Sequence, residues 1–273
     1  SFKSVTIDKI FFVLIEFGQP MHAFDLNTLN GGINVRLADG VEKLTLLDGN
    51  EITVPSDTLV IADDKQAIAL AGVFGGEATG VSDTTKDILL ECAFFAPLAI
   101  MGKSRRLGLH TDASHRFERG VDPQLQHKVM DRATRLVLDI CGGEAGQVIE
   151  ALASEHLPQP AKILLRRSKL DKTLGHVIPD SDVVEILTCL GFSVVTENHD
   201  WLVTTATYRF DMAIEEDLIE EVARIYGYDN IPNTAPQAAL NMSDHKESNI
   251  PLKRVRNMLV ARGFQEAIKI GRA

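Results

Sequence analysis

Two side chains in the first third of the chain are suited to acid–base chemistry. His22 stands in residues 18–25 (GQPMHAFD), where we expect a tight turn before a sheet. An imidazole there can act as an acid, a base or a donor that positions water, or it can satisfy backbone groups of the turn. Glu91 stands at the end of an otherwise apolar strand, residues 88–95 (ILLECAFF). A carboxylate is costly there unless it is hydrogen-bonded within the fold or awaits a polar ligand.

A glycine-rich segment, residues 72–76 (GVFGG), follows an expected strand. It lacks the Lys-Ser/Thr pair of a nucleotide-binding P-loop, so its glycines either admit a ligand close to the backbone or form a plain hairpin. The sequence contains no Gly-x-Ser-x-Gly elbow, HExxH or CxxC motif, which disfavours nucleophilic and zinc chemistry. Catalysis by this chain would therefore use water.

Basic residues are concentrated in residues 103–119. They can contact phosphates or form a solvated, salt-bridged face. The side chains concerned are Lys103, Arg105, Arg106, His110, His115, Arg116 and Arg119.

Acidic residues are concentrated in residues 211–221. Asp217, Glu220 and Glu221 are spaced i, i+3 and i+4, which puts them on one face of a helix, and Asp211 can fold back from the preceding turn. Grouped carboxylates suit Mg²⁺. The alternative is that acids in a first helical turn are favoured by the helix dipole without a metal.

The elements that must position these residues indicate an α+β chain. Residues 32–92 alternate short apolar runs with turn signals, which predicts a β-rich region followed by packed helices. Those helices are expected over residues 97–107 and from Asp122, with an Asp-Pro N-terminus, to near Cys141.

Two prolines in residues 156–161 indicate a linker to a second, smaller α+β unit. This unit is predicted to be winged-helix-like, with strand, helix, helix, two strands and helix in that order. The expected ranges are 162–165, 168–174, 182–190, 192–195, 202–207 and 215–226. An amphipathic helix is predicted over residues 251–263. The expected domains are 13–155, 162–232 and 249–268, the last being the start of a further domain.

Composition is that of a globular protein. The 273 residues carry 28 basic and 38 acidic side chains, a net charge of −10, so any nucleic-acid contact must be local. The apolar runs are shorter than the roughly 20 residues that span a bilayer, and the three cysteines are scattered. We therefore expect no membrane span, reduced thiols and a cytoplasmic protein.

Several long motifs, in order, closely resemble the β subunit of bacterial phenylalanyl-tRNA synthetase, from about residue 13 to about residue 265. They are GQPMHAFD, AGVFGGE, LLECAFF, GLHTDASHRFERGVDP, RRSKLDKTLGH and RFDMAIEEDLIEEVARIYGYDNIP. Residues 1–12 and 269–273 do not resemble the family. The resemblance implies a piece of a longer subunit that holds the editing (B3/B4) domain, the B5 domain and the start of a catalytic-like domain.

The resemblance also implies a function. The editing domain of the family hydrolyses tyrosine wrongly attached to tRNA(Phe), because a pocket built for phenylalanine cannot strongly reject an added hydroxyl. By this resemblance His22 and Glu91 are the catalytic residues, and Gly75, Thr111 and Ala113 line the editing pocket.

The resemblance further implies that Asp211, Asp217, Glu220 and Glu221 hold Mg²⁺ shared with the α subunit. The implied partners are that α subunit in an α2β2 enzyme, tRNA(Phe), and tyrosine as the editing ligand. ATP is used by the whole enzyme and not by this chain.

A rival interpretation is a non-catalytic scaffold that docks tRNA and contacts the α subunit, which would tolerate loss of His22 and Glu91. DNA binding by the second unit is a weaker alternative that the net charge disfavours.

Overall fold

The computed structural model describes residues 2–233, 235, 250–268 and 271, and the side chains from residue 10 onward. Most of the polar stretch at 232–248 and most of residues 269–273 lie outside this description. The chain divides into two compact units, residues 1–231 and 232–273. None of the described helices combines the length and the apolarity that crossing a bilayer requires.

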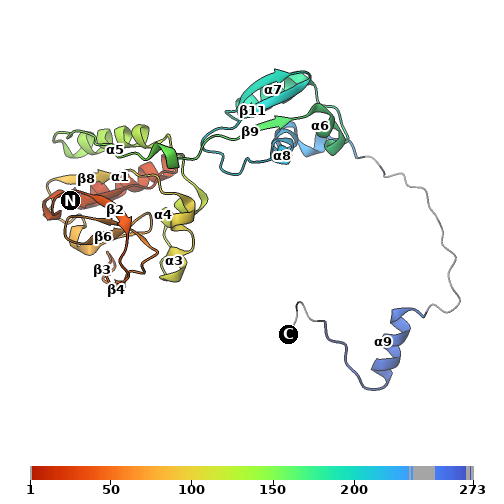
Figure 1. Ribbon diagram of the computed structural model, residues 1–273, viewed down its shortest axis with the longest axis horizontal. Coiled ribbons are helices and arrows are strands. Elements are labelled where there is room, and N and C mark those ends of the chain that lie inside the picture. The colour runs from red at the N-terminus through yellow and green to blue at the C-terminus, as the bar shows by residue number, and fades with distance from the viewer. Residues whose placement is uncertain (1, 234, 236–249, 269–270, 272–273) are drawn as a thin grey trace. The chain divides into compact units, whose positions relative to one another are not determined.

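The first part of the larger unit is built on three antiparallel sheets (Figure 1). The four-stranded sheet has the order β2-β5-β6-β7, with β2 at Asn34–Leu37, β5 at Leu59–Ala62, β6 at Ala67–Leu70 and β7 at Phe74–Gly75. The two-stranded sheets are β1 (His22–Asp25) with β8 (Ile88–Glu91), and β3 (Lys43–Thr45) with β4 (Glu51–Thr53). The β-rich region predicted for residues 32–92 is confirmed.

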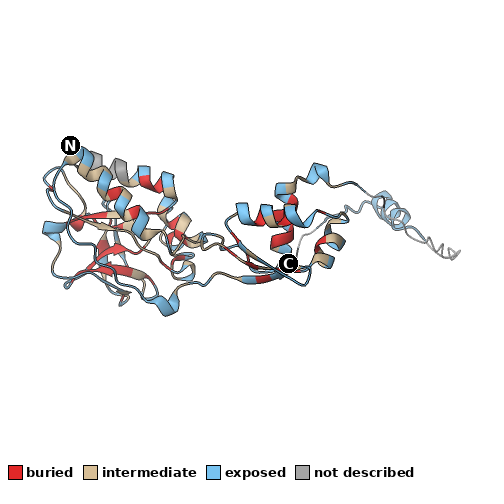
Figure 2. Cartoon of the chain, turned by 90° about the horizontal axis from the view of Figure 1, so that it is seen from above, coloured by how far each residue is buried: buried red, intermediate tan, exposed pale blue. Residues whose placement is uncertain are grey.

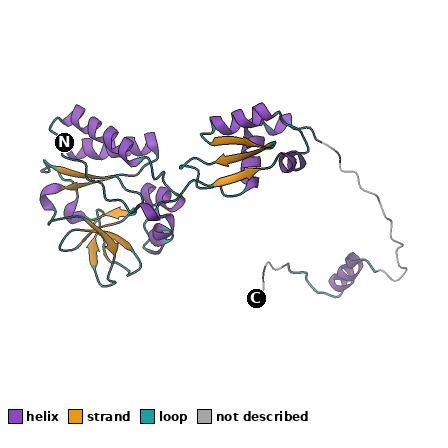
Figure 3. Ribbon diagram, turned by 45° about the horizontal axis from the view of Figure 1, so that its top comes forward, coloured by secondary structure: helices purple, strands orange, loops and turns teal. Residues whose placement is uncertain are grey.

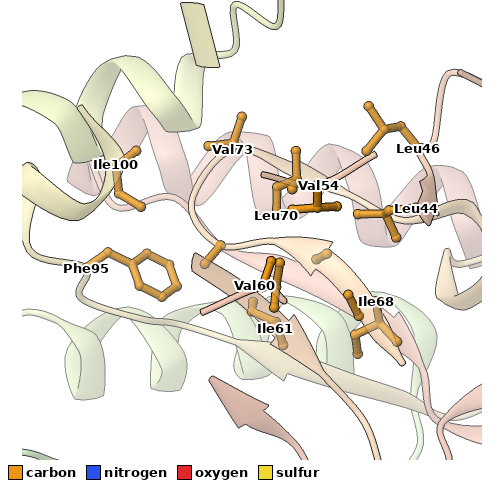
Figure 4. Packing of buried hydrophobic residues seen from close by; sticks show 14 of the residues in the cluster. Leu44, Leu46, Val54, Val60, Ile61, Ile68, Leu70, Val73, Phe95 and Ile100 are labelled. Atoms are coloured by element: carbon orange, nitrogen blue, oxygen red, sulfur yellow. The ribbon is translucent and has the colours of Figure 1, made fainter. Parts of the chain in front are cut away.

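The central strands β5 and β6 are buried almost throughout, which is why both are continuous apolar runs rather than alternating ones. Figure 4 shows Val60, Ile61, Ile68 and Leu70 of these strands packed in one cluster. Burying such side chains stabilises the fold by about 1.5–3 kcal/mol each relative to leaving them in water. This cluster is the core against which the site is built.

Two long helices cover the β1–β8 pair on the side away from the larger sheet (Figure 3). They are α1 (Phe2–Phe17), which was not predicted, and α5 (Gln126–Cys141). A small cluster around Val13, Val129 and Ala133 joins α1 and α5 to Leu90 of β8. The β1–β8 pair is therefore covered on both faces.

Three shorter helices precede α5: α2 (Pro97–Ile100), α3 (Lys103–Arg106) and α4 (Asp112–Arg119). The single helix predicted for residues 97–107 is wrong, because Gly102 adopts a left-handed conformation with φ of 76° and separates α2 from α3. Helix α5 ends at Cys141 as predicted, but it begins at Gln126 and not at Asp122. The Asp122 carboxylate instead accepts a bond from the Gln124 amide and closes a turn before the helix.

The second part of the larger unit follows the predicted order of elements. It comprises β9 (Lys162–Leu165), α6 (Arg167–Leu174), α7 (Asp180–Cys189), β10 (Ser193–Glu197), β11 (Asp200–Thr204) and α8 (Glu215–Tyr226). The antiparallel sheet has the order β10-β11-β9. Asn198 and His199 both have positive φ and form the two-residue turn between β10 and β11.

The core of this second part centres on Trp201, Leu165, Leu187 and Leu218. Figure 2 shows its buried residues on the sides of helices and strands that face one another. The observed architecture of both parts is α+β, as predicted. The short 3-10 helices are η1 (Leu26–Thr28), η2 (Glu77–Thr79), η3 (Ser154–His156) and η4 (Tyr228–Asn230).

The smaller unit contains α9 (Leu252–Ala261), which confirms the helix predicted over residues 251–263 to within two residues at its C-terminal end. Every residue of α9 is exposed.

Two adjacent leucines of β9 allow a matched test of packing in the core around Trp201. Leu165 is fully buried, whereas Leu164 is 46% exposed on the opposite face. We expect Leu165→Ala to lower the free energy of unfolding of this part by about 2–5 kcal/mol, because it leaves a cavity. Leu164→Ala should change it by about 0.5 kcal/mol. Urea denaturation of the full chain followed by Trp201 fluorescence measures both, and equal losses would contradict the observed packing.

Candidate functional site

His22 and Glu91 lie directly opposite each other across the β1–β8 pair. The strands are antiparallel, and His22 is the Cα partner of Glu91 at one end of the ladder. Opposite residues on an antiparallel pair share a face, with Cβ atoms about 4.5–5.5 Å apart. His22 therefore opens a strand and does not sit in the predicted turn. The two candidate catalytic residues, 69 positions apart in sequence, are brought together by strand register.

Both side chains line one cavity of about 80 Å³. Its other walls are apolar side chains and glycines from β5, β6, β7, the segments flanking β1 and β7, and α4. They are Pro20, Met21, Ile61, Ala69, Leu70, Gly72, Val73, Phe74, Gly75, Ala113 and Phe117. Among the described lining residues, His22 and Glu91 are the only ones with a polar side chain. The cavity is thus an apolar compartment with one imidazole and one carboxylate.

The His22 ring is held against apolar neighbours. It meets Phe24 edge-on with 4.6 Å between ring centroids. The residue as a whole is half-buried, but its Nε2 atom is shielded from solvent and has no hydrogen-bond partner among the described residues. Desolvation lowers the pKa of His22 to about 4. At neutral pH the imidazole is therefore uncharged, and Nε2 has an unused hydrogen-bonding position.

Glu91 is half-buried beside the same cavity, and its carboxylate makes no hydrogen bond or ion pair with the residues the structure describes. Desolvation raises its pKa to about 7, so both protonation states are populated at neutral pH. The neighbouring Cys92 thiol has its pKa raised to about 12, first by burial and then by the charge of Glu91. Cys92 is therefore an unreactive thiol, and Glu91 is the acidic group available to a ligand.

Gly75 makes room for the imidazole. A Cβ at this position would lie 2.5 Å from His22 Cε1 and 2.7 Å from His22 Nε2, closer than real side chains allow. Gly75 also lines the cavity, and the missing Cβ lets the His22 ring approach strand β7. Ala113 of α4 lines the same cavity.

Thr111, predicted for the floor of the editing pocket, is not among the residues that line this cavity. Its hydroxyl donates to the Val73 carbonyl at 2.9 Å and accepts from the Ser114 amide at 3.0 Å, which caps α4. Thr111 thus ties α4 to the glycine-rich loop. Sequence reasoning missed Phe117, which follows Ala113 by one helical turn and reaches the same cavity.

Three of the four carboxylates predicted to bind Mg²⁺ make hydrogen bonds or ion pairs within the described part of the chain. Arg209 engages Asp211 through Nε and Nη2 at 2.9 and 2.7 Å, and Arg209 and Arg224 both engage Glu221, at 3.2 and 2.6 Å. These guanidiniums hold the pKa values of Asp211 and Glu221 below their usual range.

The Asp217 carboxylate accepts hydrogen bonds from the backbone amides of Ala213 and Ile214, each at 2.8 Å, and so caps α8. Glu220 is exposed. In the described part of the chain no group of three or more acidic, histidine or cysteine side chains is arranged to hold a metal. The predicted ligand set does not fit Mg²⁺ in this arrangement, because Asp211 and Glu221 are engaged by arginines and Asp217 by backbone amides.

The basic segment at 103–119 is partly neutralised. Lys103 and Arg106 both pair with Asp57, and Arg116 pairs with Asp112 one turn before it on α4. These contacts favour the salt-bridged alternative for these three cations.

Comparison with known proteins shows two domain families along the chain. Residues 2–142 match the B3/4 domain model, and residues 163–228 match the tRNA synthetase B5 domain model. Over 262 residues the chain is 77% identical to the phenylalanine–tRNA ligase β subunit of Shewanella oneidensis and 62% identical to that of Vibrio cholerae. Each alignment covers 96% of this chain and 33% of the relative, so the chain spans about a third of their length.

Among solved structures, an N-terminal fragment of the phenylalanyl-tRNA synthetase β subunit from Pyrococcus horikoshii is similar at 16% identity. The similarity covers 82% of this chain and 66% of that one, with a TM-score of 0.42.

The desolvation of His22 and that of Glu91 should have opposite effects on the pH dependence of stability. Between 4.5 and about 7, folded Glu91 keeps a proton that the unfolded chain has lost, so its contribution to the free energy of unfolding falls as pH rises. Between about 4 and 6.5, unfolded His22 keeps a proton that the folded protein has lost, so its contribution rises with pH. We expect Glu91→Gln to make the free energy of unfolding rise more steeply from pH 4.5 to 6.5.

His22→Gln is the matched variant and should change the slope in the opposite direction. Urea denaturation of the full chain at a series of pH values measures both slopes. The same slope in both variants and the unmodified protein would contradict the burial of these groups.

The contact of Gly75 with His22 predicts the effect of one added methyl group. Gly75→Ala should displace the His22 ring and lower the free energy of unfolding by about 1–3 kcal/mol, as overpacking does. Gly146→Ala is the control, because a Cβ there meets nothing within 4 Å. Ring resonances of His22 and chemical denaturation report the two effects, and an unmoved His22 ring in Gly75→Ala would contradict the contact.

Proposed function

The chain belongs to the B3/4 domain family, and from that membership we propose that it is part of a phenylalanine–tRNA ligase β subunit that removes tyrosine attached in error to tRNA(Phe). One observation carries this proposal. The cavity of the B3/4 domain is apolar except for His22 and Glu91, which face each other across one strand pair. An apolar compartment with one carboxylate is suited to a phenol ring.

Glu91 is the group that recognises the tyrosine hydroxyl. The hydroxyl donates a hydrogen bond to the ionised carboxylate, which otherwise makes no hydrogen bond or ion pair with the described residues at the cavity wall. Phenylalanine offers no donor and leaves that carboxylate desolvated and unpaired, which costs about 1–3 kcal/mol or more. The site therefore discriminates by a polar contact that an isosteric ring cannot replace.

His22 is the group that orients water. With a pKa of about 4 its imidazole is a weak base at neutral pH, so it holds a water by a hydrogen bond at Nε2 rather than removing a proton outright. The water oxygen attacks the carbonyl carbon of the tyrosyl ester, the bond to the ribose oxygen breaks, and the proton that the water loses passes to that ribose oxygen. Free tyrosine and uncharged tRNA are the products.

The remaining family roles are part of the same proposal. The B5 domain contributes to assembly with an α subunit, in an α2β2 enzyme, and to tRNA binding. ATP is used by the whole enzyme for amino-acid activation. Magnesium shared with the α subunit stays a prediction, and the carboxylates at 211–221 would have to exchange arginine partners to bind it.

The role of Glu91 predicts opposite pH dependences for two amino acids. Free tyrosine should bind more tightly as pH rises through about 7, because it favours ionised Glu91, and phenylalanine should bind more weakly. Glu91→Gln should abolish both dependences and reduce the preference for tyrosine about tenfold, or about 1.4 kcal/mol. Calorimetric titration of the full chain measures these affinities, with Glu77→Gln, an exposed glutamate outside the cavity, as the control.

The scaffold alternative makes a different prediction for the same residues. If the assembled enzyme clears tyrosyl-tRNA(Phe) at an unchanged rate when both His22 and Glu91 are replaced, this cavity is not the editing site. The chain would then serve assembly and tRNA docking alone.

A further inference from the structure

Gln19 is a fully buried polar side chain three residues before His22. Its Nε2 atom donates to the Ala93 carbonyl at 2.8 Å and to the Pro20 carbonyl at 2.9 Å. Its Oε1 atom accepts from Gln126 Nε2 at 3.2 Å. Both donor hydrogens and one acceptor position of the amide are thus used in the interior.

These bonds lie where the backbone ladder stops. The β1–β8 ladder ends at the His22–Glu91 pair. Gln19 precedes β1 and Ala93 follows β8, so both lie just beyond this end of the ladder. Pro20 has no amide hydrogen, so backbone bonding cannot carry the ladder further on that chain. The side chain of Gln19 supplies the donor that the backbone lacks and closes the end of the pair.

A second glutamine ties this closure to α5. Gln126, the first residue of α5, donates to Gln19 and also to the Asp122 carbonyl at 2.9 Å. The Cys92 thiol donates to the Gln126 carbonyl at 3.6 Å. The segment before His22 and the segment after Glu91 are therefore both hydrogen-bonded to the first residue of α5.

We propose that Gln19 is the positioning residue of this site, holding His22 and Glu91 face to face across the cavity by closing the end of their strand pair. The proposal rests on the proposed function of the cavity, and it adds a residue that neither lines the cavity nor touches the substrate. Catalytic groups need such support, since a displacement of about 1 Å costs about a hundredfold in rate.

The opposite end of the same strand pair provides the matched control. There the buried Asp25 accepts from Thr85 Oγ1 at 2.5 Å and from the Asn27 amide at 3.0 Å. Thr85 is 5% exposed, and Thr85→Val removes a buried hydrogen bond from the same strand pair at the end remote from His22. It should reduce stability without disturbing the site.

The test compares Gln19→Met with Thr85→Val by two readouts. In the assembled enzyme, we expect Gln19→Met to lower kcat for hydrolysis of tyrosyl-tRNA(Phe) about 10- to 100-fold with KM nearly unchanged. In the full chain, NMR titration should show the midpoint of Glu91 moving from about 7 toward 4.5, because an open strand end admits water. Thr85→Val should leave kcat and the midpoint unchanged.

The result that overturns the proposal is a Gln19→Met protein that loses stability but keeps both kcat and the Glu91 midpoint. If Gln19→Met does not fold, Gln126→Met is measured instead. It removes the donor to Gln19 Oε1, together with the bond to the Asp122 carbonyl, and leaves both bonds that Gln19 donates, so both readouts should move in the same direction by less. Unchanged readouts there overturn the proposal. If the unmodified enzyme does not hydrolyse tyrosyl-tRNA(Phe), the proposed function fails, while the Glu91 titration still tests the positioning.

Discussion

The site depends on the register of one short antiparallel strand pair. Each strand has only four residues, and a shift of one residue would send His22 and Glu91 to opposite faces, because side chains alternate along a strand. The register is held by apolar contacts on both sides of the pair. Phe24 packs toward the larger sheet, and Leu90 packs toward α1 and α5. Gln19 closes the end of the pair beside the site, and Asp25 binds Thr85 at the remote end.

The electrostatic character of the site follows from this burial. An imidazole and a carboxylate placed side by side in water would form an ion pair. Here desolvation pushes the pKa of His22 down and that of Glu91 up, so at neutral pH the imidazole is uncharged and the carboxylate is divided between two states. Neither side chain has a hydrogen-bond partner among the residues that the structure describes around it. The free energy stored in that desolvation is available to a ligand that supplies a hydrogen bond.

In the acidic segment of the second part, residues at helical spacing share a helix but have different hydrogen-bond partners. Asp217, Glu220 and Glu221 do lie on α8, as the sequence pattern indicates. Their carboxylates nevertheless diverge, since Glu221 turns inward to Arg209 and Arg224 while Asp217 turns back to cap the helix. The helix-dipole alternative accounts for Asp217, and ion pairing accounts for Asp211 and Glu221. A spacing rule identifies which residues share a helix, whereas the partners of each side chain come from other segments.

The sequence by itself determined the local elements and the identity of the chemical groups. Alternating apolar runs and turn glycines predicted the β-rich region, helical periodicity predicted α8 and the end of α5, and the long motifs predicted the family. It could not show that His22 lies on a strand, because that depends on pairing with a distant segment. The Thr111 cap and the helix break at Gly102 are local features that the sequence pattern did not reveal. Only the tertiary structure decided that His22 faces Glu91, because strand pairing between residues 69 positions apart is set by packing against two cores and not by local preference.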